Sequence, residues 1–147
     1  MKNLLLILAT IGTLTTNAQT SAYHPLGLNG KWKLMQYKDF STGQIMNEPE
    51  KLSSSMIFEF KDDGVSGHFD GHTVTNETTG EYTLEKENII HVSKFGGTKV
   101  GEPEWGSRFW NTIYQSSSYI INQDTLTIMY DKNTKAMVFT KADTEDK

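Results

Sequence analysis

The stretch from Met56 to Leu84 constrains the fold of this chain most, because apolar residues recur there at alternate positions. This period is typical of a β-strand with one buried face. Asp62-Asp63-Gly64 follows the first strand, and a glycine after an Asp pair favours a tight reversal because it tolerates positive φ. We therefore expect an antiparallel meander. Its inward-facing residues would be Met56, Phe58, Phe60, Val65, Gly67, Phe69, Tyr82 and Leu84.

Similar patterns predict strands before and after the meander, at residues 31–37, 89–92, 119–121, 125–130 and 135–139. In the first of these strands, Trp32, Leu34 and Gln36 are expected to share one face. The polar stretch from 41 to 55 contains a glycine and a proline and predicts a loop.

One helix is expected from about residue 102 to 115, with a proline suited to its first turn. Trp105, Phe109 and Ile113 recur at four-residue spacing, which indicates one apolar face. Gly106 weakens this prediction, because glycine is a poor helix former. About eight strands and one helix predict a mainly β fold. We expect a compact antiparallel barrel or sandwich-like sheet with the helix covering one opening.

The N-terminal segment has the features of a secretory signal peptide over residues 1–18. Lys2 precedes an apolar run from Leu4 to Ala9, and small residues come before Gln19. The remaining boundaries follow from this cleavage site and from the strand pattern. We expect an extended entry over 19–27, the β domain over 28–141 and a flexible tail over 142–147.

Composition limits the classes of partner. The chain has no cysteine, which excludes disulfides and a lipid-modified N-terminal cysteine. Its net charge of −4 without a basic stripe argues against nucleic acid and anionic membrane surfaces. No second apolar run is long enough to span a bilayer. We therefore expect a periplasmic or secreted protein that is not a lipoprotein and has no cofactor.

His68, Asp70 and His72 occupy alternate positions and would therefore share one face of a strand. Two imidazoles and a carboxylate suit zinc or another divalent metal, and His91 could add a fourth ligand. The same spacing also describes the ordinary solvated face of an antiparallel sheet. The solvated face is the favoured interpretation, and a metal site is the alternative.

Aromatic residues could line a binding site in two places. On the helix, a binding surface or a lid could be formed by Trp105, Phe109, Trp110 and Tyr114, although aromatic residues at helical spacing usually belong to a core. Inside the barrel, an apolar cavity would be lined by Trp32, Phe58, Phe60 and Tyr82.

Catalysis has little support in the sequence. Without cysteine, a nucleophile would have to be a Ser or Thr beside a His and a carboxylate, and no nucleophile elbow is present. Arg108, the only arginine, is expected to pair with Glu104 four residues before it. We expect a protein that is not an enzyme.

The order of these motifs resembles that of META domains, the heat-shock HslJ-like family of exported bacterial proteins. The resemblance covers most of residues 28–141. The residues that carry it are Leu28-Asn29-Gly30-Lys31-Trp32-Lys33-Leu34, Ile57-Phe58-Glu59-Phe60, Gly64-Val65-Ser66-Gly67, Gly80-Glu81-Tyr82, Phe109, Ile113, Tyr119-Ile120-Ile121, Asp124-Thr125-Leu126-Thr127-Ile128 and Ala136-Met137-Val138-Phe139.

This resemblance implies a compact β domain with a helix, located in the cell envelope and associated with stress response, without established catalytic residues. It also implies a cysteine pair that this chain lacks. Gly71-His72-Thr73 and the residues from Lys99 to Gly101 stand at the two positions.

A weaker resemblance is to lipocalin-like calycins, whose opening Gly-x-Trp matches Gly30-Lys31-Trp32. Against it, the expected helix comes before the last strands and not after them. We therefore expect a non-enzymatic envelope domain that binds a protein or a small ligand. The alternative is a carrier of a small apolar molecule.

Overall fold

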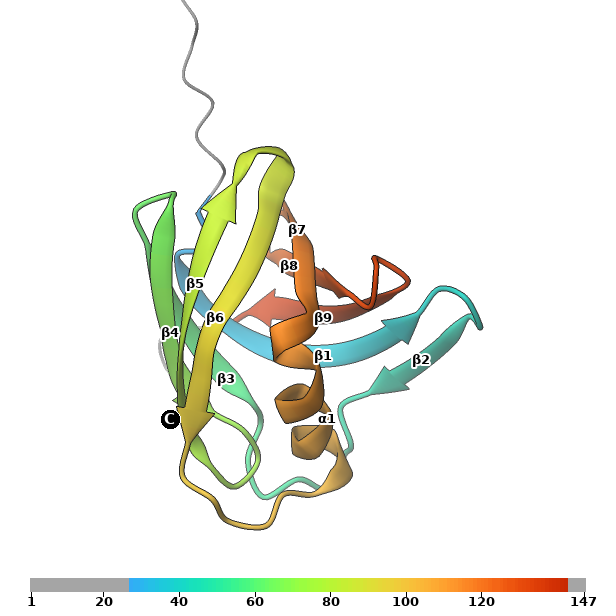
Figure 1. The fold of residues 1–147 in the computed structure, drawn as a ribbon. Coiled ribbons are helices and arrows are strands. Elements are labelled where there is room, and N and C mark those ends of the chain that lie inside the picture. Colours follow the sequence, from blue (N-terminus) through green and yellow to red (C-terminus); the bar gives the residue numbers. More distant parts are fainter. Residues whose placement is uncertain (1–26, 143–147) are drawn as a thin grey trace, which may run out of the picture.

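Nine strands form one antiparallel sheet in the computed structural model, which describes residues 27–142 (Figure 1). The strands are β1 (Gly30–Asp39), β2 (Gln44–Asn47), β3 (Ile57–Asp62), β4 (Ser66–His72), β5 (Glu77–Glu85), β6 (Ile89–Gly97), β7 (Ser116–Asn122), β8 (Thr125–Tyr130) and β9 (Lys135–Lys141). Because β1 pairs with both β3 and β9, all strands except β2 close into a barrel. The predicted antiparallel barrel is confirmed.

The two ends of the chain lie outside the described residues. They include the predicted signal peptide (1–18), nearly all of the expected entry segment and residues 143–147 of the expected tail. Ala142, the first residue of that tail, donates its backbone N–H to the Lys31 carbonyl at 2.9 Å.

The predicted helix is present as α1 (Glu104–Thr112), followed by the 3₁₀ turn η2 (Ile113–Gln115). A second 3₁₀ turn, η1 (Lys86–Asn88), joins β5 to β6. Trp105, Phe109 and Ile113 are buried, as their spacing predicted. Phe109 stacks on Phe58 of β3 at 4.5 Å between ring centroids, and Trp105 contacts Tyr37 of β1 edge-on at 4.7 Å. The helix therefore packs across one opening of the barrel (Figure 1).

The first strand departs from the predicted alternation after Leu34. Gln36 was expected to face inward, but Tyr37 is the buried residue there. The β1–β9 register shifts between Leu34 and Gln36, so Met35 is an extra residue opposite β9. A bulge of this kind moves every later side chain to the opposite face.

Two further predictions are wrong. The stretch from 41 to 55 is not entirely a loop, since β2 pairs there with the second half of β1. A four-residue strand with one partly buried residue, Met46, has too little alternation to be recognised. Val65 was expected to face inward, but it lies in the β3–β4 turn and is 57% exposed.

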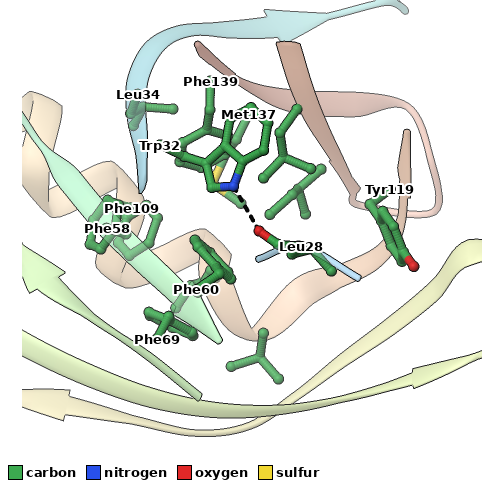
Figure 2. Close-up of a cluster of buried hydrophobic side chains, with 14 of the residues drawn as sticks. Leu28, Trp32, Leu34, Phe58, Phe60, Phe69, Phe109, Tyr119, Met137 and Phe139 are labelled. Atoms are coloured by element: carbon green, nitrogen blue, oxygen red, sulfur yellow. Dashed lines mark hydrogen bonds between the residues drawn. The ribbon is translucent and has the colours of Figure 1, made fainter. Parts of the chain in front are cut away.

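Aromatic rings fill the interior of the barrel, as Figure 2 shows. Phe60 stacks on Phe69 at 5.0 Å and meets Tyr82 at 5.6 Å between ring centroids. The Trp32 indole N–H donates to the Leu28 carbonyl at 2.8 Å, which ties the start of the domain to the core. Each buried ring removes a large apolar area from water, so these contacts dominate the stability of the fold.

The β6–β7 seam is the weakest part of the sheet. These strands share one bridge, between Ile89 and Ser118, whereas every other neighbouring pair of the sheet shares at least four. Farther along β6, the Tyr114 side chain forms the hydrogen bonds to the β6 backbone that a neighbouring strand would otherwise form. Its hydroxyl accepts from the Phe95 backbone N–H at 2.8 Å and donates to the Phe95 carbonyl at 3.0 Å.

We predict that Tyr114→Phe lowers the free energy of unfolding by about 1 kcal/mol, the usual net value of a hydrogen bond. Amide hydrogen exchange offers a sharper measurement, because the Phe95 N–H loses its partner. Its exchange should accelerate, while β6 amides that bond to β5 keep their rates. Unchanged exchange at Phe95 would contradict this role of the hydroxyl.

Candidate functional site

The candidate metal ligands His68, Asp70 and His72 share the outer face of β4, but they do not converge. His68 Nε2 lies 3.7 Å from Asp70 Oδ2. His72 is directed elsewhere, with Nδ1 at 3.4 Å from Ser54 Oγ and 3.1 Å from the Thr73 carbonyl.

His91, the possible fourth ligand, lies on β6 with Nε2 at 3.4 Å from Glu85. Within residues 27–142, no group of three or more His, Cys, Asp or Glu side chains is placed to hold a metal ion. The candidate set is therefore not assembled as a metal site in this part of the chain.

The contact between Ser54 and His72 is the nearest arrangement to a nucleophile and its base. A working pair needs a third group that orients the imidazole. In the described part of the chain, no carboxylate bonds to the His72 ring. The contact gives no support to nucleophilic catalysis.

The residues proposed to line an internal cavity belong to the packed core. Trp32, Phe58, Phe60 and Tyr82 are at most 2% exposed. Trp105, which was proposed as a ligand contact on the helix, is equally buried. Phe58 stacks on Phe109 of α1, and Phe60 packs against Tyr82, in the space that a carrier would keep open. Figure 2 shows Trp32, Phe58 and Phe60 within this cluster. This packed interior argues against the alternative of a carrier for a small apolar molecule.

The β3–β4 hairpin borders a wide groove of about 720 Å³. Its carboxylates are already engaged. Asp62 accepts hydrogen bonds from the Leu28 N–H at 2.7 Å and from the Tyr82 hydroxyl at 2.8 Å. Asp63 accepts from the N–H groups of Val65 and Ser66. These bonds hold the hairpin and leave the two acids poorly suited to binding a ligand.

A second groove, of about 510 Å³, lies between α1 and the loop after β6. We call it the α1 groove. Its wall on the helix is formed by Ser107, Trp110 and Asn111. Trp110 and Asn111 follow Ser107 by three and four residues, so the three share one helix face. Its main lining residues are Thr98, Lys99, Val100, Glu102, Trp110 and Asn111. Of the Trp residues proposed as ligand contacts, Trp110 alone reaches this surface, because it is only half-buried.

Glu102 holds one wall of the α1 groove in place. Its Oε1 atom accepts a hydrogen bond from the Thr73 hydroxyl. It also accepts from the Thr75 N–H and hydroxyl at 3.0 and 2.8 Å, and from the Asn76 amide at 2.7 Å. Asn76 in turn bonds through both side-chain atoms to the backbone of Val100. The loop between β4 and β5 is thereby tied to the loop after β6.

The other oxygen of Glu102 explains the glycine within α1. Oε2 is buried and has no hydrogen-bond partner in the described residues. It lies where a Cβ atom on Gly106 would be. The helix therefore carries glycine at this position because the carboxylate needs the space.

The hydrogen bonds keep the Glu102 carboxyl ionised. Partial burial raises its pKa, but the bonds from Thr73, Thr75 and Asn76 lower the pKa more, so the net shift is downward. At neutral pH the network therefore contains a carboxylate.

Arg108 pairs with Glu104 at 3.0 Å, as predicted, and lies 5.6 Å from the centre of the Tyr37 ring. It is therefore engaged at the helix surface. In the sequence, Glu102 stands out only as an acidic residue at the start of the predicted helix. Asn76 gives no signal at all, because its partners are distant in the chain.

Within residues 27–142, no helix combines the length and the apolar character that crossing a membrane requires.

Comparison with known proteins identifies the domain type. The family model of the META domain matches residues 25–144. The fold resembles the NMR structure of a protein from Burkholderia xenovorans, with a TM-score of 0.63 and 16% identity over 78% of this chain and 82% of that chain. It also resembles a DUF4847 family protein from Bacteroides vulgatus ATCC 8482, with a TM-score of 0.53 and 15% identity over 78% and 95%. No curated protein matches the chain.

Gly106→Ala should lower the free energy of unfolding by about 1 to 3 kcal/mol, because the added methyl overlaps the Glu102 carboxylate. Alanine is the better helix former, so helix propensity alone predicts the opposite sign. Gly96→Ala is the matched control, since nothing lies within 4 Å of its Cβ position. In a Glu102→Ala background the cost of Gly106→Ala should largely disappear. Equal costs in both backgrounds would refute the overlap.

We predict that Glu102→Gln destabilises the protein at neutral pH, and that the difference shrinks in acid. A carboxyl whose pKa is lowered by folding stabilises the folded state above its unfolded pKa. That stabilisation is lost as the pH falls through the lower folded-state value. Urea unfolding of both proteins from neutral pH to below the ordinary glutamate pKa would measure this. A constant difference would show that the charge of Glu102 contributes nothing.

Proposed function

Because the chain belongs to the META domain family, we propose that it is an exported, non-enzymatic domain of the bacterial cell envelope. In this proposal it acts by binding a protein or a small ligand, as part of the stress response of the envelope. The N-terminal apolar run and the small residues before Gln19 support export. The family resemblance supports the envelope and stress assignments.

The observation that carries binding is the α1 groove, set against a filled barrel. A volume of about 510 Å³ falls within the range of small-molecule sites. The groove exposes apolar surface, since Val100 is 62% exposed and Trp110 only half-buried. Exposed apolar residues that gather beside a groove are typical of interaction sites.

The lack of catalytic groups around this groove supports a binding role. Its one carboxylate, Glu102, is engaged on Oε1 and buried on Oε2. Acid–base catalysis requires a titratable group within reach of the substrate. None of the described histidines lines the groove.

The test compares two exposed apolar positions, one inside the α1 groove and one remote. A photoreactive benzophenone side chain would replace Val100 in one variant and Ile120 of β7 in the other, since both side chains are more than half exposed. After irradiation of the exported fraction, we expect covalent adducts of a protein or small molecule at position 100 only. The measured mass of the purified protein should also correspond to a chain that begins at Gln19.

Adduct formation at position 100 should disappear when a second substitution, Asn111→Trp, fills the groove. Equal labelling at positions 100 and 120, or adducts that persist in the filled variant, would refute the groove as the binding site. Retention of residues 1–18 in the protein outside the cytoplasm would refute cleavage of the predicted signal peptide.

A further inference from the structure

Two polar side chains border the α1 groove without being engaged. Lys99 forms no ion pair or hydrogen bond through its side chain in the described part of the molecule, and the Asn111 amide likewise has no partner there. Both residues are exposed. The groove thus offers one positive charge and one amide.

Glu102 does not cancel the charge of Lys99. Its Oε1 faces the donors of Thr73, Thr75 and Asn76, and its Oε2 is buried against Gly106. No ion pair joins it to Lys99 within residues 27–142. A cationic ligand would therefore find no accessible carboxylate oxygen on Glu102, whereas an anionic ligand would find an ammonium group.

The apolar part of the groove lies beside this charge. The Trp110 ring packs on Phe95 at 4.6 Å between centroids, and its indole N–H lies 3.4 Å from the Thr73 hydroxyl. The ring is thereby held in place while part of it remains exposed. With the exposed Val100 side chain, it forms a surface suited to an apolar group.

We propose that the α1 groove binds an organic carboxylate with an apolar body. The body contacts Trp110 and Val100, and the carboxylate accepts hydrogen bonds from the Lys99 ammonium and the Asn111 amide. Hydrogen bonds between charged partners are stronger than neutral ones, so the charge selects the acid over its neutral analogues. The inference rests on the proposed function of the groove. A free carboxylic acid and the C-terminus of a peptide share this chemistry.

The test is a titration of the protein with 3-phenylpropanoate and with the uncharged 3-phenylpropanamide. The indole N–H signal of Trp110 in two-dimensional NMR is the readout, and the buried Trp32 and Trp105 serve as internal references. We expect the acid to move the Trp110 signal and to bind at least tenfold more tightly than the amide. Lys99→Gln should remove this preference. Lys86→Gln, a change of an exposed lysine outside the groove, should preserve it.

The peptide source is tested with acetyl-Ala-Ala-Phe carrying either a free or an amidated C-terminus. If the free-ended peptide binds more tightly than 3-phenylpropanoate, the site is assigned to peptide C-termini. If the peptide binds more weakly, the site is assigned to free carboxylic acids. In either case the free-ended peptide should bind more tightly than the amidated one, and equal binding of the two peptides would contradict a carboxylate site.

Equal binding of acid and amide, or a preference that survives in Lys99→Gln, would overturn the inference and leave the groove as a binding site. Absence of any shift at Trp110 with all four probes would also overturn it. The proposed function would then still be decided by cross-linking at position 100.

Discussion

Closure of the sheet between β1 and β9 is the constraint on which the rest of the structure depends. In a closed barrel of eight strands, the inward side chains are just large enough to fill the interior. Here Phe58, Phe60 and Phe69 do so together with Phe109 from α1, and these rings occupy the space in which a carrier would hold its ligand. The proposed binding site therefore lies on the outside of the barrel, beside α1.

Glu102 connects this closed core to the candidate site. A carboxylate that is partly buried is costly unless its oxygens are hydrogen-bonded, and four donors from Thr73, Thr75 and Asn76 meet that requirement on one oxygen. The bonds join the β4–β5 loop to the loop after β6. The family resemblance implies a cysteine pair between these two regions, near residues 71–73 and 99–101. In this chain, which has no cysteine, hydrogen bonds link the two regions.

The sequence predicted most of the fold because most strands keep one face in water and one in the core. Alternation failed where the backbone itself is irregular. At Met35, one extra residue in β1 moves the later side chains of the strand to the opposite face, and no residue type in the sequence indicates this bulge. β2 is too short to show a period, and Val65 ends in a turn because the chain reverses one residue later than expected. The site was less predictable. Of its proposed residues, Trp110 reaches the α1 groove, whereas the metal set on β4 does not converge.

The sequence by itself determined the antiparallel β class, the position of the helix and the META family, because these depend on local periodicity and on the order of motifs. Tertiary structure alone decided which polar residues meet. Thr73, Asn76 and Glu102 come together only when the loops at one end of the barrel are brought side by side. Tyr114 acts as a strand partner for Phe95 only because β6 and β7 diverge there. Contacts between residues far apart in the chain leave no local sequence pattern, so they can be recognised only in the folded structure.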